Sequence, residues 1–222
     1  VHGYRALDYQ KKYIGDSGNC NNNVVCPEGD SWRDQIRSVG ILLSQNNLSA
    51  GFCTGALINN SCNDGKPYFL TANHCGADDP TTLVGFNFES TACNSNAGPY
   101  VNNTVSGVTK RANNGGSDFM LLELSSAPPA NYNVYYAGWD RSGTTTAGQV
   151  GVHHPAGDVK KISFDNQSAT QANYSGAQCW RIGAWEDGTT EGGSSGSPLF
   201  NLNGNIIGQL YGGSASCSSI TN

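Results

Sequence analysis

Short runs of hydrophobic residues alternate with polar, Gly-rich clusters along nearly the whole chain. Each run is bounded by Asn, Gly, Pro or Ser, a pattern typical of short β-strands joined by turns. No run has the length and periodicity of a long amphipathic helix. The first half predicts strands at residues 38–44, 51–59, 67–72, 81–88, 101–110 and 118–124, and the second half at 134–139, 150–154, 160–165, 179–185, 197–202 and 205–211.

A Pro-Pro pair separates these two sets of about six strands. Residues 127–131 read APPAN, and consecutive prolines cannot continue a β-ladder. We therefore predict an all-β protein of two antiparallel β-barrels, with the active site between them. The expected limits are an N-terminal extension at 1–19, a first barrel at 20–126, a linker at 127–133 and a second barrel at 134–222.

Composition narrows the classes of partner. The 222 residues include 29 Gly, only 13% are charged, and the net charge is −5. An acidic chain argues against nucleic acid as a partner, because binding its phosphates requires a basic face. No hydrophobic run approaches 18 residues, so we expect no membrane span. The chain begins at Val without a charged and then apolar leader, so we expect any signal peptide to be removed or to lie outside this sequence.

Eight cysteines, an even number, suit an oxidising compartment and therefore a secreted protein. Zinc is the rival interpretation, but no C-x₂-C pair is present and the cysteines are scattered over nearly 200 residues. We expect no metal site and no cofactor. Eight cysteines allow 105 pairings, and the spacing alone does not choose among them.

Two distant motifs carry candidate chemistry. Residues 71–75 read TANHC and residues 192–198 read GGSSGSP. A serine hydroxyl needs a positioned base to become a nucleophile, and His74 can supply one. A Gly-rich turn can point backbone N–H groups at a developing oxyanion. Asp118 opens an apolar strand between the two motifs, which gives the order His, Asp, Ser.

These motifs resemble those of chymotrypsin-like serine proteases, and the chain is most similar to the bacterial lysyl endopeptidase branch. The likeness runs from about Cys20 to the end. It rests on residues 23–30 (NVVCPEGD), 68–72 (YFLTA), 71–75, 117–124 (SDFMLLEL), 137–141 (AGWDR), 153–155 (HHP), 193–198 and 208–213 (GQLYGG).

The resemblance implies roles for individual residues. His74 would be the general base, Asp118 its orienting carboxylate and Ser195 the nucleophile, with the N–H groups of Gly193 and Ser195 as the oxyanion hole. His153 and His154 would be structural. The implied disulfides are Cys20–Cys217, Cys26–Cys93 and Cys53–Cys75, which leaves Cys62 and Cys179 to pair with each other.

The specificity pocket follows from the same resemblance. Its base would be near Thr189 and its wall would be Leu210, Tyr211, Gly212 and Gly213. In lysyl endopeptidases the acid that pairs with substrate lysine follows the region of Cys217, so it is expected beyond Asn222. Ser194 replaces the Asp that receives a freed N-terminus in digestive relatives, which favours a propeptide acting as a chaperone or plug.

Only five residues follow Cys217, although the last barrel strand of the resembled fold comes after this point. A barrel without that strand would have an unpaired edge. The sequence is then one product of an internal cut, with a C-terminal fragment completing the barrel, or it is truncated, or another segment closes the barrel.

The sequence thus predicts a secreted serine endopeptidase that acts on polypeptide substrates, cleaving after Lys or other basic residues. The alternative is a catalytically silent binding module or adhesin of the same fold. A disulfide-linked sugar-binding β-protein would explain the Asn and Gly content but not the three motifs.

Overall fold

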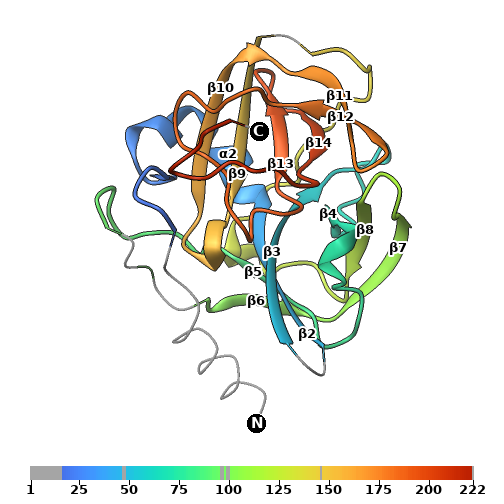
Figure 1. Ribbon diagram of the computed structural model, residues 1–222. Helices are drawn as coiled ribbons and strands as arrows, with labels where there is room; N and C mark the ends of the chain where they lie inside the picture. Colours follow the sequence, from blue (N-terminus) through green and yellow to red (C-terminus); the bar gives the residue numbers. More distant parts are fainter. Residues whose placement is uncertain (1–16, 47–48, 96–97, 99–100, 146, 222) are drawn as a thin grey trace.

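The computed structural model describes residues 17–46, 49–95, 98, 101–145 and 147–221. Two β-sheets dominate these residues, one formed mainly from each half of the chain (Figure 1). This is the all-β architecture that the sequence predicts. The extension at 1–19 lies mostly outside the described residues.

The first sheet has seven antiparallel strands in the order β6-β5-β2-β3-β4-β8-β7. Its side chains alternate as expected of a sheet with one buried face: in β8, Met120, Leu122 and Leu124 are buried and their neighbours are half-buried. They pack with Leu57 and Phe69 in one hydrophobic core. The strands are β2 (Val39–Asn46), β3 (Ser49–Ile58), β4 (Tyr68–Ala72), β5 (Leu83–Phe86), β6 (Asn103–Ser106), β7 (Val108–Asn114) and β8 (Phe119–Leu124).

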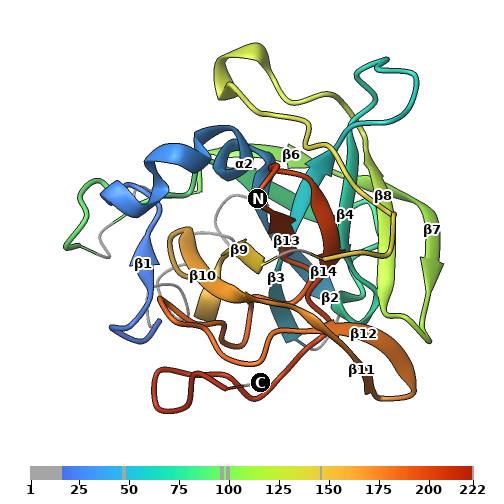
Figure 2. The same cartoon turned by 90° about the horizontal axis from the view of Figure 1, so that it is seen from above.

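The second sheet has five strands in the order β1-β10-β9-β13-β14, and β11 and β12 form a separate hairpin. Both views place this hairpin beside β14 (Figure 2), and a Cβ on Gly208 of β14 would lie 3.8 Å from Trp180 of β12. The strands are β1 (Asn22–Asn23), β9 (Ala147–His153), β10 (Lys161–Ser168), β11 (Thr170–Tyr174), β12 (Ala177–Arg181), β13 (Pro198–Asn201) and β14 (Ile206–Gln209).

Helical structure is short. The only α-helix among the described residues is α2 (Arg33–Ser38), and the 3₁₀ turns are η1 (Pro27–Trp32), η2 (Asn73–Cys75), η3 (Ala130–Tyr132) and η4 (Pro155–Gly157). Ile36 of α2 joins Val39, Ala137, Val150 and Phe200 in a core that both halves share. None of these helices has the length and hydropathy needed to cross a membrane.

Several local predictions differ from the structure. Residues 134–139 form isolated bridges instead of a strand. The predicted strand at 101–110 is divided at Gly107, whose φ of 86° breaks the extended conformation. Strand β11 was not predicted, and β1, within the expected first-barrel range, pairs with β10 of the second sheet.

Three of the implied disulfides are present, namely Cys20–Cys217, Cys26–Cys93 and Cys53–Cys75. The fourth expected pairing is wrong in this structure, because Cys62 and Cys179 are both free thiols. Cys62 lies in the exposed turn after β3, whereas Cys179 lies on the β11–β12 hairpin of the second half.

Candidate active site

Asp118 and His74 form the central contact of the candidate site. The Nδ1–H of His74 donates to Asp118 Oδ2 over 2.7 Å, and the backbone N–H of His74 donates to Asp118 Oδ1 over 2.8 Å. The Asp118 side chain is almost fully buried, whereas that of His74 is 45% exposed. The carboxylate therefore selects the Nδ1–H tautomer and leaves Nε2 available to act as a base.

Both sheets hold Asp118 in place. Its φ of 54° lies in the left-handed region, immediately before β8. Its carbonyl oxygen accepts the N–H of Asn73 over 2.8 Å and the side-chain amide of Gln209 over 2.9 Å. Because Gln209 belongs to β14 and Asn73 to η2, the carboxylate is positioned at the junction of the two halves.

The loop of residues 192–198, which carries Ser195 and is called the serine loop below, requires glycine at two positions. Gly193 has φ 95° and Gly196 has φ 81°, a region that side chains with a Cβ rarely adopt. A Cβ on Gly193 would lie 2.9 Å from the carbonyl oxygen of His154, and one on Gly196 would lie 2.4 Å from that of Thr54. The loop is therefore packed against β3 with no space for larger residues.

The loop is bonded to the first sheet through Thr54. The N–H of Thr54 donates to the carbonyl oxygen of Ser195 over 2.8 Å, and its hydroxyl donates to that of Gly193 over 3.0 Å. Cys75, next to His74, has its sulfur 3.9 Å from the Ser195 carbonyl oxygen. The structure thus brings the serine loop beside the His74 turn. Within the described residues, however, Ser195 Oγ makes no hydrogen bond to His74, a bond that in free enzymes often tightens only with substrate.

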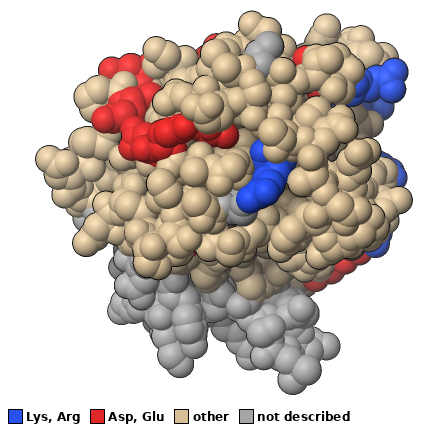
Figure 3. Space-filling view, turned by 45° about the horizontal axis from the view of Figure 1, so that its top comes forward, with Lys and Arg blue, Asp and Glu red and all other residues tan. Residues whose placement is uncertain are grey.

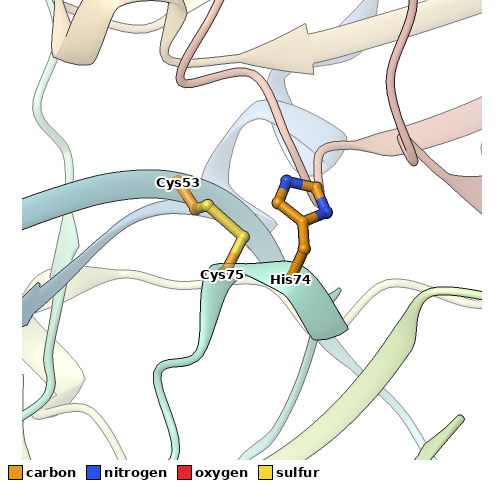
Figure 4. A group of neighbouring side chains, drawn as sticks. All are labelled: Cys53, His74 and Cys75. Atoms are coloured by element: carbon orange, nitrogen blue, oxygen red, sulfur yellow. A yellow bond between two sulfur atoms is a disulfide. The ribbon is translucent and has the colours of Figure 1, made fainter. Parts of the chain in front are cut away.

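A disulfide supports the His74 turn. Figure 4 shows the imidazole of His74 rising from η2 beside the Cys53–Cys75 bond. The ligand atoms of these three residues lie within 4.8 Å of one another. They do not form a metal site here, because the two sulfurs are bonded to each other and neither is a thiolate.

A chain of hydrogen bonds connects the serine loop to strands β9 and β10 of the second sheet. Ser194 Oγ lies 2.7 Å from His153 Nδ1, and His153 Nε2 lies 3.1 Å from Ser163 Oγ, which donates to the Thr189 carbonyl oxygen. Since Ser163 donates onward, it accepts from His153 Nε2–H, and Nδ1 accepts from Ser194. Burial, aided by the charge of Lys161, lowers the pKa of His153 to about 3. His153 is therefore neutral and structural.

Two adjacent lysines, one immediately before β10 and one at its start, are also buried. Lys160 Nζ donates to the Ile36 carbonyl oxygen over 2.8 Å and contacts Glu89 at 3.0 Å. Lys161 Nζ donates to Asn23 Oδ1 over 2.7 Å and lies 3.7 Å from Asp158. Both side chains are at most 1% exposed, so each charge is compensated by hydrogen bonds and a carboxylate.

A cavity of about 870 Å³ adjoins the site. It is lined by the predicted wall, Leu210, Tyr211, Gly212 and Gly213, together with the β11–β12 hairpin. Thr189 does not line it. Thr189 is fully buried with its carbonyl turned to Ser163, and the next residue, Thr190, faces the cavity instead.

Aromatic packing connects the cavity to His74. The ring of Tyr211 stacks on that of His74 with centroids 6.4 Å apart, and Tyr174 meets Tyr211 edge-on at 5.1 Å. The sequence analysis missed Tyr174 because its hairpin carries polar residues without a motif. Arg181 is the charged residue among those that line the cavity, and no Asp or Glu of the described part of the chain lines it.

Charge is unevenly distributed over the surface around the second sheet. On the face shown in Figure 3, acidic side chains gather in one strip, a basic side chain lies close to one end of this strip, and most of the surface is uncharged. This fits the low charge content of the chain.

Known structures share this fold. The active form of the Rv3671c protease from M. tuberculosis superposes with a TM-score of 0.58 at 16% identity, covering 94% of this chain and 81% of that one. The thermostable serine protease AL20 from an extremophilic microorganism gives 0.58 at 14% identity, covering 85% and 89%. The fold is that of the trypsin-like serine proteases.

Sequence comparison identifies the family to which this chain belongs. The family described as "Lysyl endopeptidase, C-terminal domain" matches residues 14–222. The lysyl endopeptidase of Pseudomonas aeruginosa is 35% identical over 228 residues, covering 94% of this chain and 48% of that protein. The chain belongs to the lysyl endopeptidase C-terminal domain family. It spans about half the length of this curated relative.

Proposed function

We propose that this chain is a serine endopeptidase domain in which Ser195 is the nucleophile, His74 the general base and Asp118 the orienting carboxylate. The observation that carries the proposal is the double contact between Asp118 and His74, which leaves Nε2 of His74 unprotonated near the serine loop. The proposed domain limits are 20–126 and 134–222, joined by 127–133.

The reaction proceeds by acyl transfer. Ser195 Oγ attacks the scissile carbonyl carbon as its proton passes to His74 Nε2, and the N–H groups of Gly193 and Ser195 receive the oxyanion. Collapse of this intermediate expels the amine, which takes the proton from His74. Water, deprotonated by His74, then hydrolyses the acyl-enzyme and restores Ser195.

Specificity for lysine is proposed from the family. The cavity beside Leu210 and Gly212 has room for a long side chain, and substrates are polypeptides. The edge strand β14 of the second sheet favours a further segment, either a propeptide or a C-terminal fragment, that completes this sheet. Three disulfides favour secretion.

Two experiments test the proposal. An organophosphonate probe should label wild-type chain and leave Ser195→Ala unlabelled, whereas a folded wild-type chain that resists labelling would favour the binding-module alternative. Cleavage of a denatured protein, mapped by mass spectrometry, should occur after lysine. Predominant cleavage after aromatic or acidic residues would overturn the lysine specificity and leave the protease proposal standing.

A further inference from the structure

Glu191 directly precedes the serine loop, yet its carboxylate does not face the cavity. Glu191 is absent from the residues that line the cavity in the described structure. Its Oε2 instead accepts the backbone N–H of Gly18 over 3.0 Å and the side-chain amide of Asn21 over 3.1 Å. The side chain therefore connects the serine loop to a segment some 170 residues earlier in the chain.

The main chain of Glu191 is bonded to Ser194 in both directions. The N–H of Ser194 donates to the Glu191 carbonyl oxygen over 3.0 Å, and the N–H of Glu191 donates to Ser194 Oγ over 3.2 Å. These two bonds close the turn that contains Gly193. A displacement of Glu191 would therefore rotate the N–H groups of Gly193 and Ser195.

The N-terminal segment is itself anchored at both ends. Cys20 is bonded to Cys217, and Ser17 Oγ donates to the buried Asp158 carboxylate over 2.5 Å. Gly18 lies between these anchors, where a Cβ would be 2.3 Å from Cys217 Sγ. The backbone N–H of Gly18 and the side-chain amide of Asn21 therefore reach Glu191 from a fixed position.

We propose that residues 17–21 hold the oxyanion loop in its active arrangement through Glu191, which makes Glu191 a positioning residue for catalysis. The inference rests on the proposed protease function. Donors that stabilise an oxyanion are effective only when they are already oriented before charge develops. The contact of Glu191 with Gly18 and Asn21 supplies that orientation from outside the loop.

Three variants of the full chain test this role. Glu191→Ala removes the acceptor, and Glu191→Gln keeps an oxygen that accepts from Gly18 and Asn21. The matched control is Asp187→Ala, because Asp187 Oδ1 accepts from Asn22, the residue that follows this segment, over 2.7 Å but lies outside the serine loop. We expect Glu191→Ala to lower kcat about tenfold or more, approaching the loss of one oxyanion donor. KM should change by less than about threefold, and Glu191→Gln and Asp187→Ala should stay near wild type.

A second measurement does not depend on activity. Hydrogen exchange of the peptide that covers residues 192–196 should be faster in Glu191→Ala than in wild type and unchanged in Asp187→Ala. Unchanged exchange and unchanged kcat in Glu191→Ala would overturn the proposal, as would an equal loss in Asp187→Ala or in Glu191→Gln. Failure of the protease function would appear differently, as wild-type chain that resists the phosphonate probe.

Discussion

Asp118 contacts His74 twice, through the ring nitrogen Nδ1 and through the backbone N–H. One carboxylate oxygen orients the imidazole and the other fixes the turn from which it projects. The carboxylate thus determines both the tautomer and the position of the proposed base.

Replacing Asp118 with Asn should keep the contact with the backbone N–H of His74 and change the contact with the ring nitrogen Nδ1. An amide nitrogen facing Nδ1 would favour the Nε2–H tautomer, which cannot accept the proton of Ser195. We expect Asp118→Asn to fold and to lose on the order of 10⁴-fold in kcat. Steady-state kinetics on a lysyl peptide ester measures the loss. A decrease of less than about tenfold would remove Asp118 from the proposed triad.

Gly193 is predicted to tolerate no side chain. Gly193→Ala places a Cβ 2.9 Å from the His154 carbonyl oxygen at a φ of 95°, so the loop must move. We expect a loss of turnover of about 10² to 10³-fold, as for a lost oxyanion donor.

The matched control is Gly65→Ala, because Gly65 also has a positive φ, 71°, but nothing within 4 Å of the added Cβ. Backbone strain should lower its free energy of unfolding by about 1–2 kcal/mol, and its kcat should remain that of wild type. Equal turnover in the two variants would contradict the predicted clash at Gly193.

His153 should make stability depend on pH. Burial holds its pKa at about 3 in the folded chain, whereas an unfolded histidine titrates near 6.5. The unfolded chain therefore binds the extra proton between these values, so stability is lost as pH falls from about 6.5 to about 3.

Below about pH 6 the wild-type free energy of unfolding should fall by about 1.4 kcal/mol per pH unit more steeply than that of His153→Asn, corresponding to one proton. Urea unfolding at a series of pH values measures both slopes. Parallel slopes would mean that His153 is not buried in its neutral form.

The two free thiols give a chemical test of the disulfide pattern. Under native conditions a thiol reagent should modify Cys62, which is exposed, faster than Cys179, which is half-buried. Burial, and next the negative charge of Asp118, raises the pKa of the Cys179 thiol, which slows its reaction further. Two thiols per chain should react after denaturation without reductant. If no thiol reacts, Cys62 and Cys179 are joined in the fourth expected disulfide.

Much of the fold could be predicted from alternation alone. Strand β8 was expected at 118–124 and occupies Phe119–Leu124, because its buried residues recur at every second position. Residues 134–139 were misassigned because they make only isolated bridges, Ala137 with Ile58 of β3 and Trp139 with Ile206 of β14, although Tyr135 and Ala137 pack in the shared core. The polar strand β11 has no hydrophobic period and was missed.

At the site, local motifs indicated His74 and Ser195, but contacts between distant segments could not be predicted. Nothing in the sequence around Glu191 indicates Gly18 or Asn21 as its partners, and Gln209 was considered only as part of a motif. Thr189 and Thr190 are adjacent and chemically alike, so only the direction of the main chain decides which of them faces the cavity.

The burial of Lys160 and Lys161 has a consequence for the proposed cleavage after lysine. Neither side chain can enter the cleft of another copy while the fold is intact. Lys66 precedes Pro67, whose nitrogen bears no hydrogen and whose ring restricts the backbone, and Lys110 lies in β7 with its backbone paired to β8. The placement of lysines in the described part of the chain thus resists self-digestion until the protein unfolds.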